Sequence, residues 1–127
     1  PREREWLYVA SLESDLASQG SAPGRVTFES SGETPVAISP ERESAAGFYD
    51  LYGNLWEWTD SWYTPSPEAA YLDPSREGPT LGAERVVRGG SFANTLRELS
   101  ESPRGSQPGS WCSPYLGFRL VLAPIQE

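Results

Sequence analysis

Glycine and proline interrupt this chain so often that long helices are excluded almost everywhere. Twelve glycines and twelve prolines are spread through its 127 residues. Proline removes a backbone donor and glycine weakens regular structure, so each tends to end the element that contains it. Five Trp, six Tyr and four Phe supply large apolar areas for burial. The pattern predicts a single domain, or a large piece of one, that is rich in loops and anchored by aromatic side chains.

Charge and missing residue types exclude several function classes. The net charge is −8, every basic residue is arginine, and no basic run occurs. Binding to nucleic acid or to an anionic membrane is therefore not expected. The chain has no histidine, and Cys112 is its only cysteine. A Ser-His-Asp triad, a His-bound metal and an intramolecular disulfide thus cannot be built from this chain alone. No apolar run has the length of a membrane span.

The clearest predicted helix covers residues 1–12. Its first turn carries Glu3 and Glu5, which the helix dipole favours at that end. Apolar residues three and four positions apart predict a stripe that faces the core. The members of this stripe are Trp6, Val9, Tyr8 and Leu12.

Short strands are predicted where apolar residues alternate or run together between turn residues. These strands lie at residues 25–29, 35–38, 85–87 and 117–123. The last is a nearly continuous apolar run, which is typical of a strand buried on both faces. Arg119 within it then needs a carboxylate partner, and Glu57 or Asp60 is expected.

Glycines mark two further features between the predicted strands. The Gly53-Asn54 pair between apolar residues predicts a tight turn with positive φ at Gly53. Gly89 and Gly90 are expected to permit close backbone packing after the strand at 85–87. Trp56 and Trp58 alternate around Glu57 and are expected in the core.

Three sequence strings follow one another in a specific order: GFYDLYGNLWEWTDSWY at 47–63, RVVRGGSF at 85–92 and GFRLV at 117–121. Together with the opening PREREWLYVA, they resemble the formylglycine-generating-enzyme-like, or sulfatase-modifying-factor, domain. The resemblance covers residues 1–127 as a single, partial domain, since the family's domain begins before this first helix. It implies an α+β fold of the C-type-lectin type, loop-rich, with a small twisted antiparallel sheet and its N-terminal part missing.

The resemblance also implies a structural calcium ion. In the family, the matching acidic residues bind calcium through side chains, and a glycine and an apolar residue bind it through carbonyls. Calcium prefers several oxygen ligands, and a tight glycine turn lets them converge. The matching residues here are Asp50, Gly53, Leu55 and Glu57. The alternative is that Asp50 caps a turn and that Glu57 pairs with Arg88 or Arg119.

The residues of the family's known redox chemistries are absent. In copper-dependent members two cysteines follow RGGSF, because copper(I) requires thiolates. The matching positions here are Asn94 and Leu99, and Cys112 lies on a different loop. In the related sulfoxide synthases, histidines of an attached helical domain bind iron, and this chain has no histidine. Neither copper nor iron is therefore expected to bind this chain.

The segment between RGGSF and GFR is the exposed ligand face in this family. Here it carries residues of the kind that anchor interfaces, namely Asn94, Arg97, Arg104, Trp111 and Tyr115. For Trp111 and Tyr115 the alternative is burial in the core. We expect a non-catalytic binding or scaffolding module, with a protein partner in a larger assembly.

Two other functions remain alternatives to a binding module. One is the substrate-facing lobe of a metal-dependent oxidase or oxygenase, whose cofactor would be bound elsewhere. The other is a diversified ligand-binding protein of the variable C-type-lectin kind. The family resemblance favours a periplasmic or extracellular location.

Overall fold

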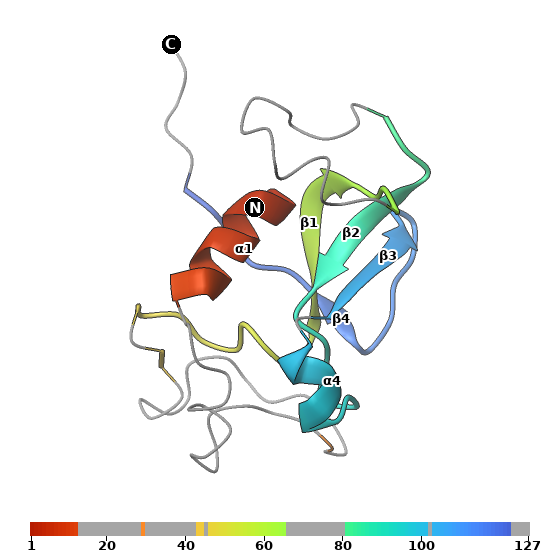
Figure 1. The fold of residues 1–127 in the computed structure, drawn as a ribbon. Helices are drawn as coiled ribbons and strands as arrows, with labels where there is room; N and C mark the ends of the chain where they lie inside the picture. Colours follow the sequence, from red (N-terminus) through yellow and green to blue (C-terminus); the bar gives the residue numbers. More distant parts are fainter. Residues whose placement is uncertain (13–28, 30–42, 45, 66–80, 102, 123–127) are drawn as a thin grey trace.

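A four-stranded sheet with one helix across its face forms the centre of the molecule (Figure 1). The structure is a computed structural model that describes residues 1–12, 29, 43–44, 46–65, 81–101 and 103–122. The elements are α1 (Glu3–Leu12), β1 (Trp56–Trp62), β2 (Glu84–Arg88), α4 (Leu96–Ser100), β3 (Arg104–Pro108) and β4 (Leu116–Gly117). The predicted helix at 1–12 and strand at 85–87 are confirmed. The predicted strand at 35–38, and all of that at 25–29 except Glu29, lie outside the described residues.

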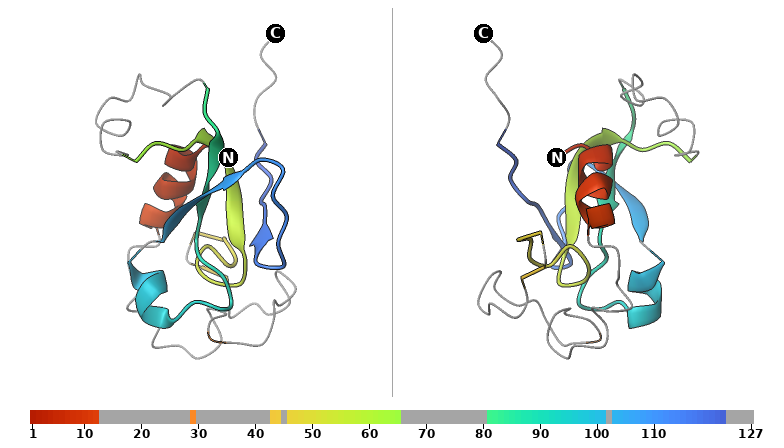
Figure 2. Two further views of the ribbon diagram at one scale, coloured as in Figure 1. Left: turned by 90° about the vertical axis from the view of Figure 1, so that its right-hand side faces the viewer. Right: turned by 60° about the vertical axis from the view of Figure 1, so that its left-hand side comes forward.

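The strand order in the sheet is β3-β2-β1-β4. β2 pairs antiparallel with both β1 and β3. β4 joins the other side of β1 in parallel, so the sheet is mixed and not wholly antiparallel as expected. The register of β1 with β2 shifts between Trp58 and Trp62. Short α4 lies at one end of the sheet, away from α1 (Figure 2). The architecture is α+β, in agreement with the sequence-based expectation.

Helix α1 buries a narrower stripe than its apolar spacing predicts. Glu3, Trp6 and Ala10 are buried, and these residues have the helical spacing of a single face. Tyr8 and Leu12 are 66% and 48% exposed, so the prediction that they belong to the inward-facing stripe was wrong. The core against this face consists of Trp6, Ala10 and Leu51, with Leu7, Val9, Phe48 and Tyr52 partly buried around it. No helix among the described residues is long and apolar enough to cross a bilayer.

The predicted glycine turn and close approach are both present. Gly53 and Asn54 have φ values of 75° and 57°, so both residues occupy the left-handed region that the turn requires. Gly89 has φ of 95°, and a Cβ there would lie 2.7 Å from the Leu51 carbonyl oxygen. The loop after β2 thus packs directly against the turn before β1, which confirms the role expected of this glycine.

The C-terminal apolar run departs most from prediction. Only Leu116 and Gly117 pair with β1, and the chain then leaves the sheet. The exposed fractions of Phe118, Leu120 and Leu122 are 73%, 86% and 100%. The prediction of a strand buried on both faces was therefore wrong for residues 118–122. The described sheet ends at β4, and no described layer covers these residues. Ala123, the last residue of the predicted strand, lies outside the described residues.

Candidate functional site

The face of the sheet beneath α1 is closed by a charged cluster. The Glu3 carboxylate accepts hydrogen bonds from Arg88 Nε and Arg104 Nε, each at 2.7 Å. Glu3 and Arg88 are each only 5% exposed. Arg104 also stacks over the ring of Tyr63, with its Cζ 4.6 Å from the ring centroid. Because a buried charge is costly without a partner, this cluster fixes α1 to β2 and β3. It is a structural element of the fold.

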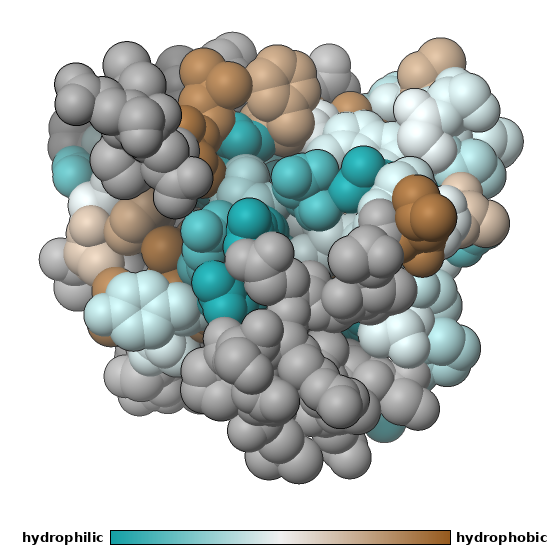
Figure 3. All heavy atoms as spheres, turned by 90° about the horizontal axis from the view of Figure 1, so that it is seen from above, coloured by the Kyte–Doolittle hydropathy of each residue, from teal (hydrophilic) through white to brown (hydrophobic). Residues whose placement is uncertain are grey.

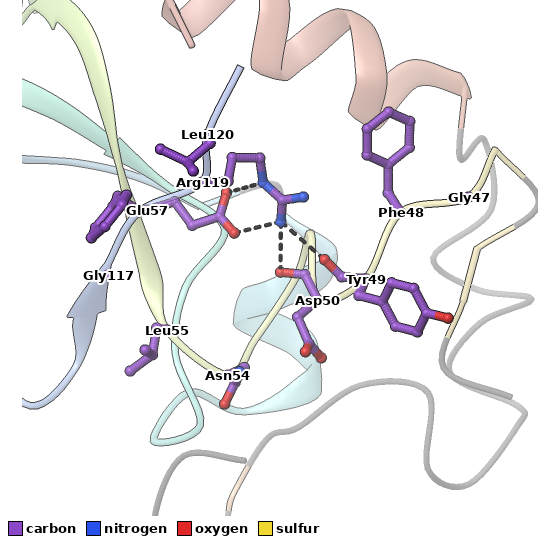
Figure 4. A pocket seen from close by; sticks show the side chains of 11 residues that line it. Gly47, Phe48, Tyr49, Asp50, Asn54, Leu55, Glu57, Gly117, Arg119 and Leu120 are labelled. Atoms are coloured by element: carbon purple, nitrogen blue, oxygen red, sulfur yellow. Dashed lines mark hydrogen bonds and ion pairs between the residues drawn. The ribbon is translucent and has the colours of Figure 1, made fainter. Parts of the chain in front are cut away.

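A second ion pair, Glu57 with Arg119, lies on the same face, because Glu57 is in register with Arg88 and binds Trp6 of α1. Figure 4 shows this pair. Arg119 Nε donates to Glu57 Oε2 at 2.6 Å, and Trp6 Nε1 donates to the same oxygen at 2.8 Å. Arg119 Nη2 also donates to Glu57 Oε1 and to the Tyr49 carbonyl. The expected pairing of Arg119 with Glu57 is confirmed. Of the two partners expected for Glu57, Arg119 binds it, whereas Arg88 pairs with Glu3.

The four predicted calcium ligands are of the chemical kind that calcium binds. Asp50, Gly53 and Leu55 lie in the segment before β1 and Glu57 lies on β1. Carboxylate and carbonyl oxygens are the donors that calcium prefers. Glu57 already accepts three hydrogen bonds from Trp6 and Arg119, of roughly four that a carboxylate offers. The Asp50 carboxylate points away from Arg119 and Glu57 (Figure 4). Among the described residues, no three His, Cys, Asp or Glu side chains gather as a metal site. Calcium binding stays a prediction.

The opposite face of the sheet carries a cavity of about 480 Å³. The side chains of Arg88 and Arg104 reach Glu3 under α1, so their strand neighbours Val87 and Gly105 face the other way. A Cβ at Gly105 would lie 3.1 Å from Val87 Cγ2, which shows how closely the floor is packed. We call this cavity the aromatic pocket. It is lined by Trp56, Val87, Ser91, Ala93, Asn94, Gly105, Ser106, Gln107, Trp111, Ser113, Tyr115 and Leu116.

The aromatic pocket combines flat apolar walls with uncharged polar groups. None of its lining residues is an acid or a base. Trp111 and Tyr115 are 54% and 44% exposed, so neither ring is folded into the core. Tyr115 is held by Phe92, with ring centroids 5.2 Å apart. Gln107 and Ser113 contribute an amide and a hydroxyl group, which offer donors and acceptors. The pocket therefore suits a neutral ligand with apolar surface.

Three of the five predicted ligand-face residues meet in the aromatic pocket, and two do not. Asn94, Trp111 and Tyr115 line it. Arg97 lies on α4, where it pairs with Glu101 at 3.6 Å. Arg104 turns to the other face of the sheet and binds Glu3. Sequence reasoning missed the floor of the pocket, which comes from β1, β2 and β3. Strand alternation could have identified the floor residues, because each of them is next in sequence to a residue whose side chain binds under α1.

The positions that match the family's copper-binding cysteines serve the fold here. Asn94 Oδ1 accepts a hydrogen bond from the Ser91 backbone N–H at 2.8 Å and so closes the turn after RGGSF. Leu99 is fully buried. Its Cδ2 would lie 2.4 Å from a Cβ at Gly90, so it fills the space that this glycine leaves open. Each position supports local packing in place of a thiolate.

One carboxyl group and one phenol group on the loops around the site have shifted pKa values. Thr95 is the N-cap of α4 and exchanges hydrogen bonds with Glu98 in a capping box. The Thr95 backbone N–H holds the pKa of Glu98 below its ordinary value of 4.5. A hydrogen bond to Glu43 raises the pKa of Tyr49. Both groups are at the surface, so they affect the loops around the site rather than its floor.

Comparison with known proteins identifies the family. Residues 3–124 match the sulfatase-modifying factor enzyme 1-like domain. The chain belongs to this family. It is 32% identical over 108 residues to the formylglycine-generating enzyme of Streptomyces coelicolor, covering 81% of the chain and 34% of that enzyme. It is 38% identical over 136 residues to the serine/threonine-protein kinase Pkn1 of Chlamydia trachomatis, covering 95% of the chain and 20% of the kinase.

A third relative has a different named activity. The chain is 43% identical over 65 residues to the hercynine oxygenase of Mycolicibacterium smegmatis, covering 46% of the chain and 15% of that protein. The chain thus spans about a third or less of the length of these curated relatives.

Solved structures support the same fold. PvdO from Pseudomonas aeruginosa superposes with a TM-score of 0.59 at 22% identity, covering 70% of this chain and 33% of that one. Treponema denticola variable protein 1 superposes with a TM-score of 0.58 at 24% identity, covering 74% of this chain and 34% of that one. These likenesses establish the C-type-lectin-like fold of the formylglycine-generating-enzyme-like domain.

Proposed function

We propose that this formylglycine-generating-enzyme-like domain is a non-catalytic binding module whose ligand site is the aromatic pocket. One observation carries the proposal: a cavity of about 480 Å³ presents aromatic and neutral polar side chains on the family's ligand face. Large cavities of this kind, with a few convergent polar groups, are the usual place for a ligand. The two positions that match the copper ligands are meanwhile used for turn closure and packing by Asn94 and Leu99.

The chemistry of the pocket favours a protein partner that presents a short neutral segment. Half-exposed Trp111 and Tyr115 are the residue types that dominate binding energy at protein interfaces. Gln107 and Ser113 offer an amide and a hydroxyl group to peptide N–H and C=O groups, whereas the Ser106 hydroxyl donates to Glu84 Oε2. A charged ligand would lose its hydration without gaining a charged partner, and it is therefore disfavoured.

The relatives indicate that the fold of this domain does not fix its chemistry. A formylglycine-generating enzyme, a hercynine oxygenase and a protein kinase share sequence with this chain. The matched region is 20% of the kinase, so this type of domain occurs as a minor part of a differently named protein. Function in such cases follows the site and not the fold. Here the site lacks thiolate and imidazole groups.

The test is selection of binders from a displayed random-peptide library against the purified chain. We expect selected peptides to share a neutral, apolar-containing core, and Trp111→Ala to weaken their binding at least tenfold. Tyr8→Ala is the matched control, because Tyr8 is an exposed aromatic residue on α1 and does not line the pocket. Ala93→Trp fills the exposed rim and should block binding with little effect on folding. Equal binding by all three variants and the unaltered chain would exclude the pocket as the ligand site.

The second candidate is the substrate-facing lobe of an oxidase or oxygenase, and the names of two relatives favour it. It would require copper or iron to support oxygen consumption by the chain. We expect no oxygen uptake above buffer with copper(I) or iron(II) and a cysteine-containing peptide. Uptake that persists in Cys112→Ser but disappears in Trp111→Ala would locate redox chemistry in the aromatic pocket. That result would overturn the binding proposal.

A further inference from the structure

The hydrogen-bonding groups of the aromatic pocket are unequally divided between donors and acceptors. Two of its lining groups, the indole N–H groups of Trp56 and Trp111, can only donate. Among the described lining residues, no side chain can only accept, because none is a carboxylate. Neither indole N–H group makes a hydrogen bond within the part of the chain that the structure describes. Both are therefore available to a ligand that accepts hydrogen bonds.

The fold uses acceptors of the pocket for its own hydrogen bonds. Asn94 Oδ1 accepts from the Ser91 backbone N–H. Ser113 Oγ accepts from the Tyr115 backbone N–H at 3.1 Å, which leaves the Ser113 hydroxyl proton as a donor. The backbone carbonyl groups of four lining residues also accept backbone N–H groups, and these residues are Ser91, Asn94, Ser113 and Tyr115. A ligand N–H group in the pocket would compete with these bonds, and a buried donor without an acceptor is costly.

The walls of the pocket present aromatic rings. Trp111 and Tyr115 come from the loop between β3 and β4 and are 54% and 44% exposed. Trp56 lies on β1, and a Cβ at Gly105 would lie 3.6 Å from its Cζ3, so this glycine lets the ring pack against β3. Figure 3 offers a contrast at the end of the molecule seen from above, where hydrophobic residues lie apart with hydrophilic residues between them. The aromatic pocket gathers its rings within one cavity.

A proline-rich segment has the properties that this combination of groups requires. Each proline has a carbonyl group that accepts hydrogen bonds and has no backbone N–H to satisfy. Such segments form a polyproline II helix, which has three residues per turn and no internal hydrogen bonds. Grooves lined by aromatic side chains bind this preformed helix in other proteins. The polyproline II helix therefore matches both the aromatic walls and the excess of donors.

We propose that the aromatic pocket binds an uncharged, proline-rich segment of a protein partner in the polyproline II conformation. The proline rings pack against Trp111 and Tyr115, and the segment's carbonyl groups accept hydrogen bonds from the indole N–H groups. This inference rests on the proposed function, because it narrows the ligand of the same site to one class of peptide.

Three fluorescein-labelled peptides test the role of the missing N–H groups. The first repeats Gln-Pro-Pro, the second has alanine at each proline position, and the third has N-methylglycine there. N-methylglycine lacks the proline ring but also lacks the backbone N–H. By fluorescence polarisation, we expect the proline peptide to bind at least tenfold more tightly than the alanine peptide, with the N-methylglycine peptide in between. An N-methylglycine peptide that binds no more tightly than the alanine peptide would overturn the inference.

Trp111→Phe tests the indole donor, because it keeps an aromatic face and removes the N–H group. We expect it to weaken binding of the proline peptide by about threefold or more, the effect of one lost hydrogen bond. Trp62→Phe is the matched control, since Trp62 is a partly buried tryptophan of β1 that does not line the pocket. It should leave the affinity unchanged, and the melting temperature of both variants checks that they are folded. Equal affinity of Trp111→Phe and the unaltered chain would contradict the assigned donor.

The outcomes separate this inference from the proposed function. If the proline and alanine peptides bind equally and Trp111→Ala weakens both, the pocket binds neutral segments without selecting proline, and only the inference fails. If Trp111→Ala binds the proline peptide as tightly as the unaltered chain does, the pocket is not the site and both proposals fail. Absence of binding by the proline peptide overturns the inference alone, because the peptide-library selection tests the proposed function separately.

Discussion

Arg119 Nε lies 2.6 Å from Glu57 Oε2, and this bond joins the segment after β4 to the middle of the sheet. The Glu57 side chain is 10% exposed and that of Arg119 is 22% exposed. Breaking such a pair leaves a partly buried charge without its partner. We expect Glu57→Gln to lower the free energy of unfolding by about 2 to 4 kcal/mol, measured by urea denaturation. A loss below about 1 kcal/mol would mean that solvent screens the pair.

The double variant Glu57→Gln with Arg119→Met tests the cause of this loss. The double variant has no unpaired guanidinium. We therefore expect it to recover at least half of the free energy of unfolding that Glu57→Gln loses. If the double variant is as unstable as Glu57→Gln alone, the Trp6 hydrogen bond to Glu57 is the more important contact.

Gly90 should tolerate no side chain. Its φ is 72°, and a Cβ there would lie 2.4 Å from Leu99 Cδ2. We expect Gly90→Ala to cost at least about 1 kcal/mol of stability, from backbone strain and the displaced leucine. Gly109→Ala is the control, since nothing lies within 4 Å of a Cβ there, and it should change stability by less than about 0.5 kcal/mol. Thermal unfolding of both variants measures the difference.

The capping box of α4 predicts a specific acid sensitivity. Because the Thr95 N–H lowers the pKa of Glu98, the folded state binds this proton less readily than the unfolded chain. The stabilisation is therefore complete above the ordinary value of 4.5 and is lost as pH falls through the lower folded-state pKa. Glu98→Gln keeps a capping side chain that does not titrate, so its melting temperature should fall less steeply below pH 4.5.

Thr95→Ala provides the complementary variant for the same helix. It removes the side chain that accepts from the Glu98 N–H, so it should cost about 1 kcal/mol at neutral pH. A parallel acid profile for Glu98→Gln and the unaltered chain would show that the capping box does not govern acid sensitivity.

Calcium binding can be tested simply, by measuring the melting temperature in solution with and without calcium. Asp50, Gly53, Leu55 and Glu57 carry oxygen donors of the right kind, so calcium at a hundredfold excess over its dissociation constant should add about 2.7 kcal/mol of stability. We expect Asp50→Ala to abolish this response to added calcium and to chelator. Glu101→Ala should retain it, because Glu101 is exposed and distant in sequence from these residues. An unchanged melting temperature in the unaltered chain would exclude calcium.

Local signals predicted the elements that depend on neighbours in the sequence. The first helix, the Gly53 turn and the strand at 85–87 are confirmed, because capping, positive φ and alternation act over a few residues. The partner of Arg119 was also predictable, since a charge in an apolar run needs an opposite charge.

Features that depend on distant layers were not predictable in the same way. An apolar run at 118–122 looks the same whether a covering layer is present or not, and here it is exposed. The direction of Arg104 depends on the register of β3 with β2, which no local pattern specifies. The burial of Glu3 had a weak signal, its helical spacing with Trp6 and Ala10, but acidic residues usually remain in water.

Glu3 binds partners 85 and 101 residues further along the chain. During synthesis at about 5 to 20 residues per second, Glu3 is therefore added to the chain roughly 5 to 20 seconds before Arg104 exists to hold it. A ten-residue helix is marginal on its own in water over that interval. Folding of this domain must accordingly wait for nearly the whole chain, and nascent chains stalled before residue 104 should be the preferred targets of chaperones and proteases.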